Sequence, residues 1–174
     1  METDIVDVVG AGLAGCECAC QLADRGVRVR LHEMRPQTMS PAHHTGHMAE
    51  LVCSNSFKST RDDSAAGLLK NELRRMGSVL VSCAERAQVP AGGALAVDRD
   101  EFSRFVEQEV SSRPGIEVVR GEVAGIPDGH AVIAAGPLCS PALSARVLEL
   151  VGGEALSFYD AAAPIVDAEA LDRS

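Results

Sequence analysis

The sequence predicts an α/β fold with a parallel sheet, and three observations in its first 33 residues predict it. An apolar run at 5–9 leads into a glycine-rich turn at 10–15. Residues 13–25 then favour a helix, which Gly26 ends. From 27 to 33 apolar and polar side chains alternate, which is the period of a second strand. A strand, a tight turn, a helix and a strand in this order predict a βαβ unit with parallel strands.

Composition places the chain among cytosolic globular proteins. It has 174 residues, enough for one domain or for the front portion of a larger protein, and 46% of them are hydrophobic, enough for a core. No apolar run approaches the roughly 20 residues of a membrane span. Asp4 and Asp7 interrupt the start, where a signal peptide needs an apolar stretch. We therefore expect a cytoplasmic protein with no membrane partner, whose six cysteines are reduced thiols.

The remaining sequence adds helices and two returning strands. Residues 34–63 are expected to be loop-like, whereas the leucine spacing from 65 to 86 predicts one long helix. The further expected elements are a turn at 90–93, a helix at 100–110, strands at 116–120 and 132–135, and a helix from Ser140-Pro141 to about 151.

A last candidate strand, 158–168, has no later segment with which to pair, so we expect an N-terminal fragment. In this interpretation residues 1–152 are the first part of a nucleotide-binding domain, and residues 153–174 are the incomplete start of a second, inserted domain. The first part is divided into a βαβ unit at 1–33, a loop and helices at 34–110, and returning strands at 116–137.

The turn has the pattern of a dinucleotide fingerprint. Gly10 permits the tight turn, Gly12 lets the backbone approach a pyrophosphate, and Gly15 allows close contact between helix and strand. The helix that begins here offers N–H groups and the positive end of its dipole to the anion. Glu33 ends the second strand, where a carboxylate can accept hydrogen bonds from both ribose hydroxyls of an adenosine. Together these features predict binding of the ADP half of a dinucleotide.

Features around this turn favour FAD as that dinucleotide. Glu33 would repel a ribose 2′-phosphate, which disfavours NADP at this site. Arg35 and the apolar strand that runs into Gly136-Pro137 resemble FAD proteins of the glutathione-reductase type. We therefore predict a Rossmann-like FAD-binding domain of that type, truncated, with the start of a second domain. The residues expected to contact FAD are Gly10, Ala11, Gly12, Leu13, Ala14, Gly15, Glu33, Met34, Arg35 and Gly136.

The histidines and most cysteines do not predict a metal site. Cys16 and Cys20 share one face of the first helix while Cys18 points roughly the opposite way, so all three are expected to be small packing residues. The cluster of His43, His44, His47, Glu50 and Cys53 could supply zinc ligands in principle, but it lacks a paired CxxC or a second ligand group. We expect surface histidines, or histidines near the flavin or an anionic substrate.

Cys53 has two interpretations. Ser54, Asn55 and Ser56 follow it and are good helix N-cap residues, and a thiol at a helix start has a lowered pKa. From the residues alone, a buried structural thiol is favoured over this reactive one.

Charge is unevenly distributed along the chain. The net charge of −9 disfavours non-specific affinity for nucleic acid. Residues 28–75, however, hold eight of the 16 Lys and Arg, five of the 25 Asp and Glu, and four of the five His. An ordinary solvated face is the simpler interpretation, and a strip that faces phosphate or RNA is the alternative.

Seven motifs in the sequence occur together in one known family. They are DVVGAGLAG (7–15), EMRP (33–36), PAH (41–43), AELVCSNS (49–56), GLLK (67–70), VPAGGALAVDR (89–99) and YDAAAPIV (159–166). With these motifs the chain resembles the bacterial folate- and FAD-dependent tRNA (uracil-5-)-methyltransferases over nearly its whole length.

The resemblance implies a reaction and its partners. Methylenetetrahydrofolate donates a one-carbon unit, reduced FAD supplies reducing equivalents, and C5 of a T-loop uridine in tRNA is methylated, while NAD(P)H regenerates reduced FAD. Of the family's two cysteines near the flavin, one matches Cys53, which makes it the candidate catalytic residue. The other, which attacks the uracil, belongs to a segment beyond Ser174, so this fragment alone is expected to be inactive.

Two alternatives stay open. One is another FAD-dependent tRNA-modifying oxidoreductase of the same fold, against which the motif around Cys53 argues. The other is a nucleotide-binding fragment that holds ADP-like ligands without turnover.

Overall fold

The computed structural model describes residues 5–152. In chain order the strands are β1 (Ile5–Val9), β2 (Arg28–Glu33), β3 (Ser56–Ser59), β4 (Gln88–Val89), β5 (Ala94–Val97), β6 (Ile116–Arg120) and β7 (His130–Ile133). The α-helices are α1 (Leu13–Ala23), α2 (Ala65–Arg75), α3 (Val79–Arg86), α4 (Arg99–Ser112) and α5 (Pro141–Val151), and a short 3-10 helix covers Gly136–Leu138.

A parallel four-stranded sheet forms the centre of the fold, as predicted. Its order is β6-β2-β1-β7, so the βαβ unit supplies the two inner strands. The register aligns Val8 with Leu31 and Leu31 with Val118. Because parallel strands point the same way, the segments after β1, β2, β6 and β7 all meet at one edge of the sheet.

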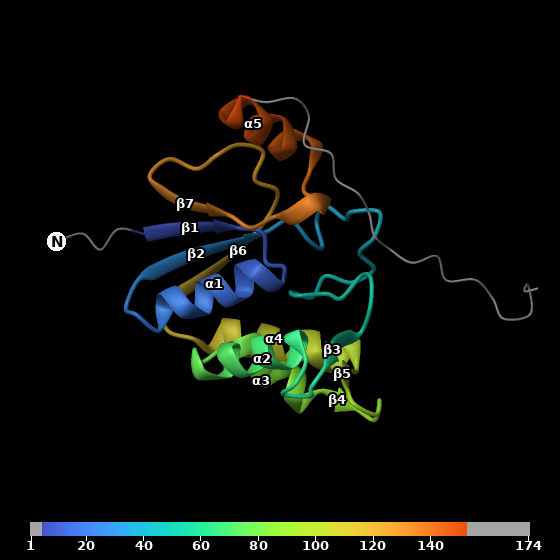
Figure 1. Cartoon of the computed structure of the whole chain (residues 1–174). Helices are drawn as coiled ribbons and strands as arrows, with labels where there is room; N and C mark the ends of the chain where they lie inside the picture. Colours follow the sequence, from blue (N-terminus) through green and yellow to red (C-terminus); the bar gives the residue numbers. More distant parts are fainter. Residues whose placement is uncertain (1–4, 153–174) are drawn as a thin grey trace, which may run out of the picture.

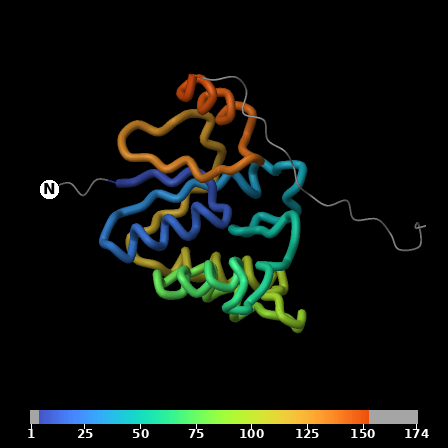
Figure 2. Tube along the Cα trace, viewed as in Figure 1, coloured from blue at the N-terminus to red at the C-terminus, as the bar shows by residue number. Residues whose placement is uncertain are grey.

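Helices cover the sheet on both sides (Figure 1). Helix α1 packs between the sheet and helices α3 and α4, while α5 lies on the opposite side of the sheet. The tube in Figure 2 shows the connection from β6 to β7 also passing over that opposite side. Small side chains on α1 allow close packing, since Cys16, Ala19 and Cys20 are buried against Val8 and Leu31. Cys18 is only half-buried, in agreement with its predicted direction.

A second, antiparallel sheet was not predicted. It has the order β3-β5-β4. Strand β3 lies inside the stretch 34–63, so the prediction that this stretch is loop-like is wrong for residues 56–59. A β-bulge interrupts the pairing of β3 with β5, and Lys58 at this bulge has a φ of 65°. These strands have two to four residues each, too short to show a clear alternation in the sequence.

The single helix predicted at 65–86 is also wrong, because the chain breaks there into α2 and α3. Gly77 adopts a φ of 74°, a left-handed conformation that suits glycine. Ser78 then caps α3 by accepting a hydrogen bond from the Val81 N–H. The leucine spacing continues across the break, which explains why it predicts one helix.

The later elements confirm most of the sequence predictions. Strand β6 has the predicted bounds, and β7 begins two residues before the predicted 132. The side chain of Ser140 caps α5 by accepting from the Leu143 N–H, and Gly152 ends the helix with a φ of 64°. The candidate strand at 158–168 and the start of a second domain lie outside the described residues. Within residues 5–152, no helix is both long and apolar enough to cross a bilayer.

Candidate dinucleotide-binding site

The glycine-rich segment that forms the turn after β1 and the start of α1 has three glycines with different surroundings. A Cβ at Gly10, whose φ is 102°, would lie 2.6 Å from the Cα of Ala135, and a Cβ at Gly15 would lie 1.8 Å from the carbonyl oxygen of Gly10. Both distances are far below contact distance, so packing excludes any side chain at these two positions. A Cβ at Gly12 would meet nothing within 4 Å. Gly12 therefore faces open space, where the fingerprint predicts the pyrophosphate.

The peptide groups of Ala11 join this turn to two other segments. The Ala11 N–H donates to Oε2 of Glu33 at 3.1 Å, and the Ala11 carbonyl accepts from the Ala49 N–H at 2.9 Å. Ala49 is fully buried and has a φ of 52°, which is unusual for a residue with a side chain. The turn is thus held by the end of β2 on one side and by the loop after β2 on the other.

A buried guanidinium connects the same two segments. Arg35, 2% exposed, donates from Nε to Glu33 Oε1 at 2.9 Å and from Nη2 to Oε2 at 3.2 Å. Its Nη1 donates to Glu50 Oε2 at 3.0 Å. Glu50 also accepts from the N–H groups of His44 and Thr45. Glu33, Arg35 and Glu50 therefore form a network beneath the turn in which each buried charge has a partner.

This network holds both carboxyl groups in their charged form. Burial raises the pKa of Glu33, but the hydrogen bonds and charge of Arg35 and the Ala11 N–H outweigh burial and leave that pKa below its ordinary value. Burial likewise raises the pKa of Glu50, and the hydrogen bonds from His44 and Thr45 outweigh it, so this pKa is also lowered. Neither carboxyl group is protonated at neutral pH.

Arg120, at the end of β6, fixes the loop from outside. Its Nη1 donates to the carbonyl oxygens of Arg35 and Gly46, at 3.0 and 2.8 Å, and its Nη2 donates to Glu107 Oε1 at 2.6 Å. The other Glu107 oxygen is 2.7 Å from Nδ1 of His47. Strand β6, helix α4 and the loop are thereby joined close to the sheet edge. The role of Arg120 was not predicted, since no local sequence pattern indicates contacts with residues that lie 13 to 85 positions away in the chain.

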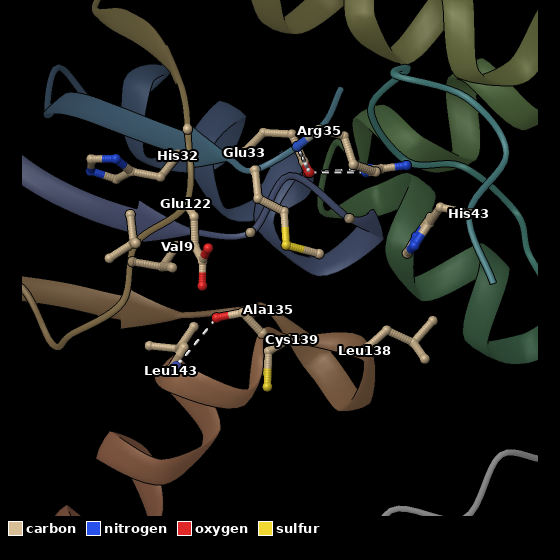
Figure 3. A pocket seen from close by; sticks show the side chains of 16 residues that line it. Val9, His32, Glu33, Arg35, His43, Glu122, Ala135, Leu138, Cys139 and Leu143 are labelled. Atoms are coloured by element: carbon tan, nitrogen blue, oxygen red, sulfur yellow. Dashed lines mark hydrogen bonds and ion pairs between the residues drawn. The ribbon is translucent and has the colours of Figure 1, made fainter. Parts of the chain in front are cut away.

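A pocket with a cavity volume of about 80 Å³ opens at this sheet edge. Figure 3 shows side chains from the ends of β1 and β2, from the segment after β6 and from the start of α5 lining it. The lining residues are Val9, Gly10, Gly12, His32, Glu33, Met34, Arg35, His43, Gly121, Glu122, Val123, Ala135, Leu138, Cys139, Ser140 and Leu143.

Residues 5–174 match the model of the family described as glucose inhibited division protein A, or GidA. The chain belongs to the GidA family. Within this family it is 55% identical to the methylenetetrahydrofolate–tRNA-(uracil-5-)-methyltransferase TrmFO of Brevibacillus brevis, in a match over 99% of the chain and 39% of that relative. It is 54% identical to TrmFO of Bacillus cereus strain AH187, over 99% of the chain and 40% of the relative. The chain thus spans about two fifths of the length of these relatives.

Solved structures agree on the fold. GidA of Aquifex aeolicus superposes with a TM-score of 0.56 at 15% identity, over 71% of this chain and 20% of that one. NikD, an amino acid oxidase of nikkomycin biosynthesis, superposes with a TM-score of 0.51 at 18% identity, over 86% of this chain and 55% of NikD. At these identities the likeness shows the α/β fold and nothing further.

The pocket of this GidA-family chain includes half of the residues predicted to contact a cofactor. Gly10, Gly12, Glu33, Met34 and Arg35 line it. The other five, Ala11, Leu13, Ala14, Gly15 and Gly136, do not. Of these, Ala11 supports the turn through its hydrogen bond to Glu33, and Gly15 packs against the carbonyl group of Gly10. The lining residues that were not predicted include Val9, His32 and Ala135, next to the predicted positions, and residues from 121–123 and 138–143, where no motif marks them.

The structure corrects the expected environment of Cys53. Its side chain is exposed, so the interpretation as a buried structural thiol is wrong. No helix begins at Ser54, Asn55 or Ser56; strand β3 begins at Ser56 instead. Cys53 lies outside the pocket lining, beyond the loop that Arg35 and Arg120 hold. The thiol is therefore placed at the surface rather than in the core.

The nearby histidines have separate partners. His43 Nδ1 lies 2.6 Å from Ser40 Oγ, whereas His47 pairs with Glu107. Burial lowers the pKa of His43, and the charge of Arg35 lowers it further, so this ring at the pocket is neutral at pH 7. Among residues 5–152, His, Cys, Asp and Glu form no group of three suited to a metal ion.

Most cations of the locally basic stretch at 28–75 are engaged within the protein. Arg35 and Lys70 are buried, and Lys70 donates to the Phe57 carbonyl at 2.7 Å. Arg30, Arg61 and Arg74 pair with Asp7, Asp63 and Glu85, respectively. Among the described residues, the side chains of Arg28, Lys58 and Arg75 remain exposed without an ion pair. The strip therefore offers fewer cations to an anionic partner than its composition indicates.

Proposed function

We propose that the chain is the FAD-binding part of a cytoplasmic, folate-dependent tRNA methyltransferase that forms 5-methyluridine in the T-loop. In this proposal methylenetetrahydrofolate is the carbon donor and NAD(P)H the reductant. The 55% identity to a relative named as methylenetetrahydrofolate–tRNA-(uracil-5-)-methyltransferase supports the reaction. The observation that carries the cofactor assignment is the glycine motif itself: Gly10 and Gly12 both line the pocket, and of the three glycines Gly12 alone has open space where a Cβ would lie.

The residues at the sheet edge fit the ADP half of FAD. The pyrophosphate would lie over Gly12, where no Cβ occupies the space and the N-terminus of α1 offers its dipole. The ribose would meet the end of β2 at Glu33. Met34, Arg35 and Gly136 complete the proposed contact set, with Arg35 keeping Glu33 charged from beneath. When bound, the flavin would supply the redox chemistry that converts the folate one-carbon unit to a methyl group.

Cys53 is proposed to act in the chemistry of the reaction. It is exposed and lies on the segment that continues from the loop bound to the turn through Ala49. An exposed thiol can reach a substrate or cofactor, whereas a buried one cannot. Attack on uracil C6, which makes C5 nucleophilic, needs a thiolate, and the resemblance assigns that step to a different cysteine outside this chain. In the proposal, Cys53 is the other of the two cysteines that the family places near the flavin.

The alternative is a dinucleotide-binding module without turnover. Most cations of the basic stretch at 28–75 are paired within the protein, which favours this alternative over an RNA-binding role for this part of the protein alone.

An assay of flavin binding and methyl transfer to a T-loop transcript, with the full-length protein, distinguishes the methyltransferase from the binding module. The proposal predicts a bound flavin spectrum and methylation that requires methylenetetrahydrofolate. A transcript with cytidine at the target position is the matched control and should not be methylated. Flavin binding without methylation would support the binding module.

A further inference from the structure

Two acidic side chains line the pocket, and they differ in what they have left to offer a ligand. The Glu33 carboxylate accepts four hydrogen bonds: from the N–H of Ala11 and Nη2 of Arg35 at Oε2, and from the N–H and Nε of Arg35 at Oε1. A carboxylate has about four acceptor positions, so the protein itself occupies those of Glu33. A ribose hydroxyl must share an oxygen or displace the longest contact, that of Nη2 at 3.2 Å.

Glu122, in contrast to Glu33, has acceptor positions that the described part of the protein does not use. It is exposed and lines the pocket, and within residues 5–152 its carboxylate makes no hydrogen bond or ion pair. Figure 3 shows its side chain extending from the segment after β6 into the pocket, toward the start of α5. It is therefore the charged acceptor in the lining with capacity for a new donor.

The sheet order indicates which part of an adenosine Glu122 would meet. Gly121 donates its N–H to the Glu33 carbonyl at 2.8 Å, so Glu122 follows directly on the contact between β6 and β2. Going outward from the turn, β1 comes first, then β2 with Glu33, then β6 with Glu122. Neighbouring strands are about 4.8 Å apart. With the pyrophosphate at the turn and the ribose at β2, the base reaches the end of β6.

The surroundings of Glu122 suit a purine. Val9, Val123 and Leu143 give the pocket apolar walls for the faces of a flat ring. An adenine carries one strong donor on its edge, the exocyclic amine, and a carboxylate is an acceptor when charged. We propose that the Glu122 carboxylate accepts a hydrogen bond from the exocyclic amine of the adenine and so selects an adenine dinucleotide. This inference rests on the proposed binding of FAD.

The test compares FAD with a flavin dinucleotide whose base is unsubstituted purine, which lacks only the amine. Both are titrated into the full-length apoprotein. The parent should bind FAD about tenfold or more tighter than the purine analogue, because a hydrogen bond to a charged group is lost. Glu122→Ala should bind the two ligands about equally. Glu122→Gln should keep part of the preference, since its amide oxygen still accepts.

Asp128→Ala is the matched control, because Asp128 is an exposed carboxylate on the same connection and does not line the pocket. It should discriminate between the ligands as the parent does. A parent that binds both ligands equally, or a Glu122→Ala variant that discriminates as well as the parent, would overturn the inference. A parent that does not bind FAD at all would overturn the proposed function, and melting temperatures of all variants confirm that the exposed substitutions leave the fold intact.

Discussion

Ala49 donates its backbone N–H to the carbonyl of Ala11 at 2.9 Å, and this bond closes a ring of contacts around the glycine-rich turn. From Ala11 the ring continues through its N–H to Glu33, through Arg35 to Glu50, and back along the chain to Ala49. The turn and the loop after β2 are therefore one structural unit. Perturbing the buried charges should affect both cofactor binding and stability.

Replacing Glu33 by Ala should weaken FAD binding by roughly tenfold to a hundredfold, because an acceptor for ribose and the brace of the Ala11 N–H are both lost. It should also lower the free energy of unfolding by about 3 kcal/mol, because Arg35 loses its main partner while it stays buried. Titration with FAD and thermal unfolding measure the two effects. Unchanged FAD affinity would contradict the fingerprint interpretation.

The same network predicts an acid-dependent stability. The pKa of both Glu33 and Glu50 lies below the ordinary value of about 4.3, so their contribution is fully present above that pH. As the pH falls below about 4, the unfolded chain binds protons that the folded chain does not, and the contribution is lost. The melting temperature of the parent should fall more steeply below pH ~4 than that of Glu33→Gln. Parallel curves would show that Glu33 does not contribute.

The glycines allow a separation of binding from folding. Gly12→Val places a side chain in open space, so it should leave the melting temperature nearly unchanged and abolish FAD binding, because the pyrophosphate position is filled. Gly15→Ala, the matched comparison, forces a Cβ against the carbonyl oxygen of Gly10 and should destabilise the fold itself. FAD binding by Gly12→Val at parental affinity would place the cofactor elsewhere.

The sequence could predict features that depend on local spacing, but not those that depend on contacts between distant segments. The β1–α1–β2 unit and its glycines are encoded locally, by spacing within 33 residues, and the structure confirms the elements. Glu122 and Arg120 were missed because their roles depend on the pairing of β6 with β2, which no local pattern reveals. The break at Gly77 was missed because the apolar period continues through it, and the exposure of Cys53 because burial depends on how a loop docks.

The proposed RNA contact rests on fewer cations than the composition indicates. Lys58 is exposed at the bulge of β3, whereas Arg61 donates to Asp63 at 2.9 and 2.5 Å. In the full-length protein, Lys58→Ala should weaken tRNA binding and reduce the slope of log K against log salt by about one. Arg61→Ala should have a smaller effect, since its charge is already partly compensated. A salt slope identical to the parent's for Lys58→Ala would assign this residue to the ordinary solvated surface.

Cys53 should matter for chemistry and not for folding. Because its side chain is exposed, Cys53→Ala creates no buried cavity. The free energy of unfolding should therefore change by no more than the ~0.5 kcal/mol typical of surface substitutions, and the melting temperature should stay close to that of the parent. Bound flavin should also be retained, since Cys53 is outside the pocket lining. Methyl transfer to a T-loop transcript by the full-length protein should nevertheless be lost. Cys83→Ala is a useful contrast, because Cys83 is fully buried, so this variant should lose stability while keeping activity below its melting temperature. Full activity in Cys53→Ala would show that the thiol is an ordinary surface residue and that the chemistry depends on groups elsewhere in the protein.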